Sequence, residues 1–169
     1  MATQPDSLPS ESTATLATLV RDFTDVRAFS LKFLANMSEK EALKVPAGSN
    51  NCLHWHLGHL LYTQGTTLYE WCGLPSPFPR RFKEYFGLGT SPKGYDSLIP
   101  DWDSLLALGA KHHRSLPGEV SGRLHQPLVK PYRLMNISMA TVGETLPFLL
   151  AHEGEHIAHI KRLRKAVRP

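Results

Sequence analysis

The amino-acid sequence predicts an all-α fold, a four-helix bundle with a long proline-rich connection between its second and third helices. Apolar residues recur every three or four positions in the long segments, and breaks rich in proline and glycine separate these segments. No stretch alternates regularly enough to predict a sheet. The chain of 169 residues has the length of a single domain, which we place at residues 12–169 after a flexible polar segment at 1–11.

The first two helices are predicted on either side of one clear break. Apolar residues at helical spacing predict a helix over residues 12–37. The sequence VPAGSNN at 45–51 ends it, and Asn50 or Asn51 is expected to cap a second helix. This second helix is expected to end near Trp71, because a glycine and a proline follow.

The segment at 74–100 contains five prolines and several glycines, which predicts a long ordered loop. A short helical turn is expected within it, near residues 82–86. Loops of this length inside a compact domain are often functional. The aromatic residues of this loop fit a lid over a substrate and a dimer contact equally well.

The last two helices flank a region of mixed character. The third helix is expected to open at Trp102 and to stop near Leu116, because a proline and a glycine follow. Residues 119–140 combine two prolines with short alternating stretches, and we predict no sheet there. The fourth helix is expected to be capped by Thr141 or Gly143 and to run nearly to the end of the sequence.

The composition argues against a nucleic-acid-binding or membrane protein. The net charge is +4, the basic residues are spread along the chain, and no apolar run approaches the roughly eighteen residues of a membrane span. Cys52 and Cys72 lie twenty residues apart in one predicted helix, about 30 Å along its axis, so they cannot form a disulfide bond. Free thiols and the lack of a signal-peptide pattern predict a cytoplasmic protein.

Six of the nine histidines lie in two short windows, at 54–59 and 152–159. On the predicted fourth helix, His152, His156 and His159 share one face within an arc of about 60°. Imidazoles one turn apart, at positions i and i+4, can bind one metal ion at about 2.0–2.1 Å. The fourth helix therefore supplies two candidate metal ligands, His152 and His156.

On the predicted second helix, a polar stripe borders the apolar face and is expected to line a cavity between helices. The stripe contains Cys52, His56, His59 and Thr63. His56 and His59 are alternatives for a third metal ligand, and Gly58 slightly favours His59 because its missing side chain lets another element approach. His54 projects on the opposite flank and is expected to be exposed or to pack beside Trp55.

Residues 152–156 read HEGEH and match the H-E-x-x-H pattern of zinc proteases, in which two histidines bind zinc and the glutamate activates water. Those enzymes take a third ligand from further along the chain. Only thirteen residues follow His156, and none of them is aspartate or glutamate. A protease of this type is therefore not expected, and Glu153 is expected to support a ligand or to lie at the surface.

The same residues carry a resemblance to a known family. The break GSNN at 48–51, the run LHWHLGHLLY at 53–62, the proline-rich middle and the closing LLAHEGEHIAHIKRLRK at 149–165 resemble the DinB/YfiT-like superfamily of metal-dependent proteins. The likeness covers roughly residues 12–167. In that family a G-H-L element on the second helix supplies one metal-binding histidine, and a closing H-x-x-x-H supplies two more. The resemblance implies that His59, His152 and His156 are the ligands of an open three-histidine site.

The resemblance also implies an up-down-down-up order of the four helices and, often, a homodimer. Pocket-lining or ligand-supporting roles are expected for His56, Thr63, Glu153 and His159. His159 stands where the family usually has glutamine, so it would add either a pocket base or a fourth ligand. The ion is expected to be zinc or nickel, with iron and manganese as alternatives, because affinity order alone does not select the metal.

Three histidines and an open position fit a catalytic ion better than a structural one. Some relatives of this fold transfer groups with low-molecular-weight thiols, and a thiolate is a good zinc ligand. The resemblance therefore predicts a metal-dependent transferase of the small-thiol type, acting on a small molecule. A metal-dependent hydrolase and a non-enzymatic, metal-holding bundle associated with stress or DNA damage are the alternatives. No catalytic residue is assigned beyond the metal ligands.

Overall fold

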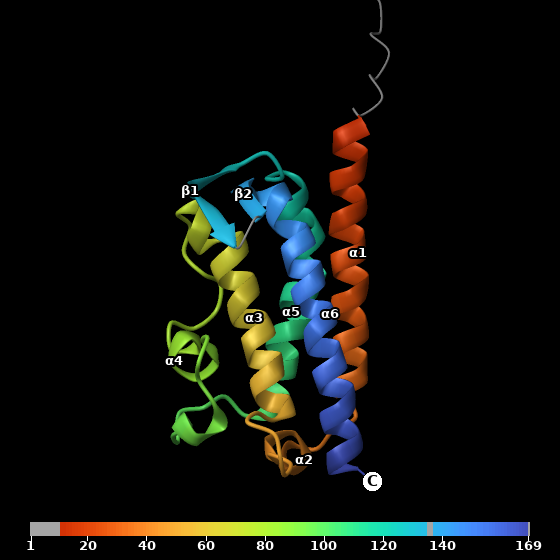
Figure 1. Cartoon of the computed structure of the whole chain (residues 1–169), viewed down its shortest axis with the longest axis vertical. Coiled ribbons are helices and arrows are strands. Elements are labelled where there is room, and N and C mark those ends of the chain that lie inside the picture. The colour runs from red at the N-terminus through yellow and green to blue at the C-terminus, as the bar shows by residue number, and fades with distance from the viewer. Residues whose placement is uncertain (1–10, 135–136, 169) are drawn as a thin grey trace, which may run out of the picture.

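The computed structural model describes residues 11–134 and 137–168 (Figure 1). Its fold is mostly helical, as predicted. Four long helices lie side by side, namely α1 (Glu11–Leu34), α3 (Leu53–Leu68), α5 (Trp102–Ser121) and α6 (Val142–Val167). In Figure 1, α1 and α6 run downward, whereas α3 and α5 run upward. The segment predicted to be flexible, 1–11, lies outside the described residues except for Glu11, where α1 begins.

The core lies between these helices and consists of two packed clusters. One surrounds α3 and includes Leu57, Leu60 and Trp102, and the other includes Val20 and Leu146, where α1 meets α6. Each such side chain contributes about 1.5–3 kcal/mol when fully buried. Every residue from 52 to 61 is buried, so the three histidines in this run need hydrogen-bond partners inside the protein.

The start of the chain differs from the prediction in two details. The helix predicted over 12–37 ends at Leu34, and a short helix α2 (Glu39–Leu43) follows. Ser38 and Glu41 form a capping box at the N-terminus of α2, so α2 begins as a separate helix. Neither Asn50 nor Asn51 caps α3. Its N-cap is Cys52, which makes no capping hydrogen bond through its side chain, so the buried Leu53 and its neighbours position this end by packing.

The proline-rich segment after α3 folds against that helix. A 3₁₀ turn, η1 (Glu70–Cys72), precedes this segment, which contains the short helix α4 (Phe82–Phe86) and a second 3₁₀ turn, η2 (Pro92–Gly94). The helical turn predicted near 82–86 is therefore confirmed. Phe82, Tyr85 and Phe86 are buried, and their packing places α4 along the flank of α3 (Figure 1).

The prediction that the third helix stops near Leu116 is wrong, because α5 continues through Pro117 to Ser121. Proline in a helix interior removes one backbone hydrogen bond and usually ends or kinks the helix. Here Leu116 and Val120, on either side of Pro117, are both buried in the cluster between α1 and α6. Burial of Val120 compensates for the missing hydrogen bond and carries the helix for one further turn.

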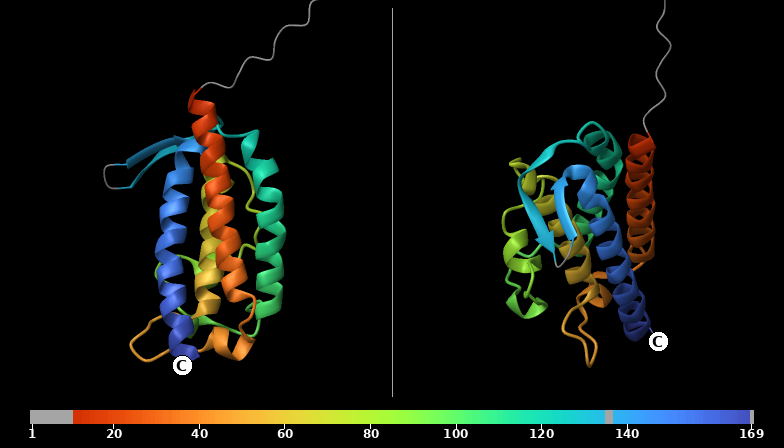
Figure 2. Two further views of the ribbon diagram at one scale, coloured as in Figure 1. Left: turned by 90° about the vertical axis from the view of Figure 1, so that its right-hand side faces the viewer. Right: turned by 45° about the horizontal axis from the view of Figure 1, so that its top comes forward.

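The region at 119–140 was predicted to contain no sheet, and this prediction is also wrong. Strand β1 (Pro127–Leu134) pairs with β2 (Ile137–Thr141) as an antiparallel hairpin. The pairing shifts register between Pro127 and Tyr132, which disrupts the regular alternation that would have predicted a strand. The two strands project from the bundle (Figure 2), and a ring stack between Trp71 and Tyr132, with centroids 4.0 Å apart, ties them to η1.

The last helix begins and ends as predicted. Thr141 is the N-cap of α6, and its side chain accepts a hydrogen bond from the backbone N–H of Glu144. Cys52 and Cys72 are both free thiols. None of the helices formed by the described residues combines the length and the apolar character that crossing a membrane requires.

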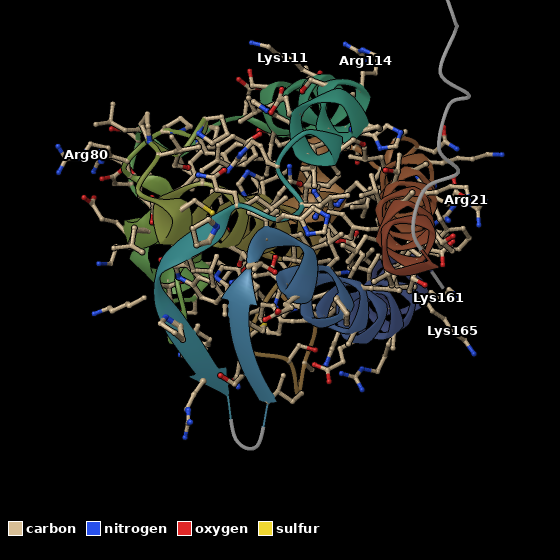
Figure 3. The ribbon with its side chains drawn as sticks, turned by 90° about the horizontal axis from the view of Figure 1, so that it is seen from above. Arg21, Arg80, Lys111, Arg114, Lys161 and Lys165 are labelled. Atoms are coloured by element: carbon tan, nitrogen blue, oxygen red, sulfur yellow. The ribbon has the colours of Figure 1, made fainter. Side chains whose placement is uncertain are left out.

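The basic side chains are spread over the molecule. Figure 3 shows Arg80 on one side, Lys111 and Arg114 on a second, and Lys161 and Lys165 on a third. A nucleic-acid-binding surface would gather such cations on one face.

Candidate metal centre

Three histidines from distant parts of the sequence meet between α3 and α6. His59 comes from α3, and His152 and His156 come from α6. One ring nitrogen of each lies within 4.8 Å of the others. Because His152 and His156 are one helical turn apart, they lie one above the other on the face of α6 that packs against α3.

The orientation of His59 leaves one ring nitrogen free. Its Nδ1 lies 2.6 Å from the backbone carbonyl oxygen of Phe86 and donates to it, so Nε2 keeps its lone pair. This Nε2 lies 3.2 Å from Nε2 of His152. Two nitrogens bound at about 2.0–2.1 Å in a tetrahedral site are about 3.4 Å apart, so the observed spacing fits two ligands of one ion. Trp55 stacks on the His59 ring at 4.6 Å and limits its rotation.

Gly58 explains how the Phe86 carbonyl reaches His59. A Cβ atom at Gly58 would lie 2.3 Å from the Phe86 ring, a distance at which something must move. The missing side chain therefore allows Phe86 and the end of α4 to pack directly on α3. The close approach predicted from Gly58 is confirmed, and the element that approaches is α4.

His56 contacts the cluster without belonging to the group of three. Its Nδ1 lies 2.8 Å from Nδ1 of His156, and one of the two nitrogens donates to the other. With the proton on Nδ1 of His156, the Nε2 of that ring is free to bind an ion. His56 then holds the His156 ring in the same way that the Phe86 carbonyl holds His59.

Burial keeps these rings neutral. Loss of hydration, followed by repulsion from neighbouring histidines, lowers the pKa of His156 to about 2, of His56 to about 3 and of His152 to about 4. Burial also lowers the pKa of His59. Because neutral imidazole is the form that binds a metal ion, the cluster is ready to bind one at neutral pH.

Glu153, the glutamate of the H-E-x-x-H pattern, is fully buried in a separate network. Arg27 donates from Nε at 3.0 Å and from Nη2 at 2.8 Å to its carboxylate, and Ser30 donates at 2.7 Å. Nη1 of Arg27 also donates to the side-chain oxygen of Gln64 at 2.8 Å. A carboxylate held by these donors is not free to activate a water molecule, so the geometry argues against protease chemistry. Of the two positions predicted for Glu153, the surface position is wrong.

A cavity of about 680 Å³ opens beside the cluster and reaches it at His156. The loop at 46–51 forms one wall. The other wall consists of Trp55, His56, Glu155, His156, His159, Arg162, Leu163 and Ala166. His159 lines this cavity, and its Nδ1 accepts a hydrogen bond from Nη2 of Arg162 at 2.7 Å, but it is not part of the three-histidine group. Thr63 and Glu153 lie outside the cavity lining.

Of the two positions predicted for His54, the exposed one is wrong. Its side chain is fully buried, with Nε2 2.8 Å from the Pro100 carbonyl oxygen and Nδ1 3.1 Å from the Tyr95 hydroxyl. The proline-rich segment covers this flank of α3, and no helical periodicity could have shown that. His54 therefore ties this segment to α3 from the side opposite the three-histidine cluster.

Two contributors were missed in the sequence. Arg27 lies at helical spacing from Phe23 and Leu34, on the apolar stripe of the first helix, and a charged residue in that stripe was a readable signal of a buried ion pair. The Phe86 carbonyl had no such signal, because any residue supplies a backbone oxygen and only the fold places it.

Comparison with known proteins identifies the family to which the chain belongs. A scan against protein-family models matches the DinB superfamily over residues 22–160, a range that includes His59, His152 and His156. The match covers most of the sequence, and the chain therefore belongs to the DinB superfamily. A search of curated proteins found no match.

Proposed function

We propose that the chain binds one divalent metal ion through His59, His152 and His156 and acts as a metal-dependent enzyme of the small-thiol transferase type. One observation carries this proposal, namely the convergence of three neutral imidazoles next to a cavity. Neutral histidines fit zinc or nickel, and also iron or manganese. When bound, such an ion lowers the pKa of a water or thiol and polarises a carbonyl group.

The number of protein ligands supports a catalytic role. Structural zinc sites are closed by four protein ligands, whereas catalytic sites use three and leave a position open. The group of histidines contains three residues, and the cavity adjoins it at His156. A small molecule in the cavity would therefore reach the open side of the site.

The residues around the cluster have separate tasks in this proposal. His56 and the Phe86 carbonyl hold the rings of His156 and His59. Trp55 and Leu163 give the cavity an apolar wall that excludes water. His159 lines the cavity, and because Arg162 donates to its Nδ1, the other ring nitrogen carries the proton and can donate a hydrogen bond to a bound molecule.

A closed, non-enzymatic site is the competing proposal, and one observation favours it. Nδ1 of His56 is 2.8 Å from Nδ1 of His156, so a rotation of these two rings would bring a fourth nitrogen to the ion. Such a site would hold the helices together without chemistry. A metal-dependent hydrolase would use the same open site with water in place of the thiol.

The proposal also includes the helix order and the oligomeric state that the family resemblance implies. The directions in which the four long helices run in Figure 1 support the up-down-down-up bundle of this proposal. The proposal further includes a homodimer, as the family resemblance implies. Light scattering on the purified protein tests the dimer, and a mass equal to one chain would contradict it.

The activity is tested with protein purified without a histidine tag, loaded with zinc or nickel and mixed with a small thiol and an electrophile. Thiol-dependent consumption of the electrophile that stops on metal removal is the expected result. Turnover of ester or amide substrates without thiol would instead support the hydrolase. Stoichiometric metal without either activity would support the closed site.

A further inference from the structure

We propose that the cavity beside the histidine cluster selects small molecules that carry an anionic group, and that the Arg162 guanidinium binds this group. The proposal deepens the proposed function and rests on it, because it takes this cavity as the substrate site. The observation that supports this inference is the arrangement of charged side chains around the cavity.

Arg162 lines the cavity at its exposed side. It follows His159 by three residues, which places it about 60° further around α6. Its Nη2 donates to Nδ1 of His159 at 2.7 Å, and this bond holds the guanidinium beside His159. The described residues form no other hydrogen bond with this guanidinium, so its remaining N–H groups can donate to a ligand. A guanidinium suits this task because two of its parallel N–H groups match the two oxygens of a carboxylate.

No carboxylate of the described residues neutralises this cation, since none of their ion pairs includes Arg162. The cavity does contain one acidic residue, Glu155. It precedes Arg162 by seven residues, which is about 10 Å along the helix axis, so the two charges lie toward opposite ends of the cavity wall.

Arg164, two residues further along α6, differs from Arg162 in its position and in its contacts. Arg164 lies outside the cavity, and its guanidinium stacks on the ring of Phe33 at 4.2 Å. It shares the charge and the helix of Arg162 but not the position, which makes it a matched control.

The opposite wall is formed by the loop at 46–51, which turns at Gly48, whose φ of 76° is left-handed. This loop contains no aspartate or glutamate, so the wall adds no negative charge to the cavity. The side-chain oxygen of Asn51 is buried and offers no contact to a ligand. The cavity therefore fits a carboxylate-bearing thiol.

The test compares three probes by calorimetric titration of the zinc-loaded protein. Mercaptosuccinate carries a thiol and carboxylates, 1-thioglycerol carries a thiol without charge, and succinate carries carboxylates without a thiol. A hydrogen bond to a charged partner contributes about 1.5–3 kcal/mol, so Arg162→Gln should weaken the binding of mercaptosuccinate and of succinate about 10- to 100-fold. Arg162→Gln should change the affinity for 1-thioglycerol less than about twofold. Arg164→Gln should change the affinity for each of the three probes less than about twofold.

Each outcome separates this inference from the proposed function. Equal weakening of charged and neutral thiols by Arg162→Gln, or no weakening of the anions, would overturn the role of Arg162 and leave the metal site standing. Failure of the protein to hold zinc, or of thiols to bind the zinc-loaded protein, would contradict the proposed function. Titration of the metal-free protein with succinate then still decides the inference. Weaker succinate binding in Arg162→Gln but not in Arg164→Gln supports it, and unchanged binding in Arg162→Gln overturns it.

Discussion

Nδ1 of His59 lies 2.6 Å from the carbonyl oxygen of Phe86, and this hydrogen bond decides which nitrogen of His59 faces the other histidines. The bond depends on a close approach of α4 to α3, which Gly58 allows. Outer contacts of this kind typically change metal affinity 10- to 100-fold when they are lost. The arrangement of the three histidines thus depends on the packing of α4 against α3 as well as on the histidines themselves.

Gly58→Ala should therefore weaken zinc binding about tenfold and destabilise the protein by about 1–3 kcal/mol, because the new methyl group pushes Phe86 away from α3. Competitive titration with a chelating dye measures the affinity, and urea unfolding measures the stability. Gly154→Ala is the control. It lies between His152 and His156 on α6, and an added Cβ there meets nothing within 4 Å. Zinc binding by Gly58→Ala that equals that of Gly154→Ala would show that the Phe86 contact is dispensable.

Replacing any one of His59, His152 and His156 by alanine should abolish stoichiometric zinc binding, measured by elemental analysis of the dialysed protein. His54→Ala should retain one ion per chain. It should nevertheless lower stability by about 1–3 kcal/mol, because the Pro100 carbonyl and Tyr95 hydroxyl lose their buried partner. If His59→Ala still binds zinc at full stoichiometry, the third ligand is His56 or His159.

Arg27→Met should destabilise the protein by about 3–5 kcal/mol, because it leaves Glu153 buried without its charged partner. Glu153→Gln should also destabilise the protein, because it leaves the Arg27 guanidinium buried without a counter-charge and places an amide N–H group where the carboxylate accepts hydrogen bonds. Arg21→Met is the control, because Arg21 and Asp22 form an exposed pair at 3.7 Å. Its effect should stay within about 0.5 kcal/mol in urea unfolding. Similar losses in Arg27→Met and Arg21→Met would contradict the importance of the buried pair.

The metal-free protein should lose stability as pH falls from 7 to 5. The pKa of His56 and of His156 is about 3 and about 2 in the folded chain and about 6.5 when unfolded, so the unfolded state binds more protons below pH 6.5. Stability is therefore fully present above pH 7 and falls with acidification, by about 1–2 kcal/mol for each of these two rings. Urea unfolding at four pH values measures the loss, and His56→Gln should reduce it. Constant stability over this range would contradict the burial of neutral rings.

The sequence predicted those features of this site that follow from the spacing of residues along a helix. His152 and His156 were readable from their spacing of one turn. The polar stripe left His56 and His59 as alternatives, and the family resemblance selected His59. The bounds of α6 and the helical turn at 82–86 followed from local caps and breakers. Local rules decide these features, and a single sequence contains them.

The rest depended on contacts between distant segments. Pro117 reads as a helix end, yet burial of Val120 against α1 and α6 carries the helix past it. His54 reads as exposed, yet the segment after α3 folds back over it. The hairpin was missed because its irregular register hides the alternation of its strands. In each case tertiary packing outweighed the local preference.

Diffraction data collected at the zinc absorption edge, from crystals of untagged zinc-loaded protein, test the central claim most directly. One anomalous peak per chain, within about 2.0–2.1 Å of a ring nitrogen of each of His59, His152 and His156 and with a fourth position facing the cavity, is the predicted result. A peak bound by four protein nitrogens would contradict the open site. No peak between α3 and α6 would contradict the metal centre itself.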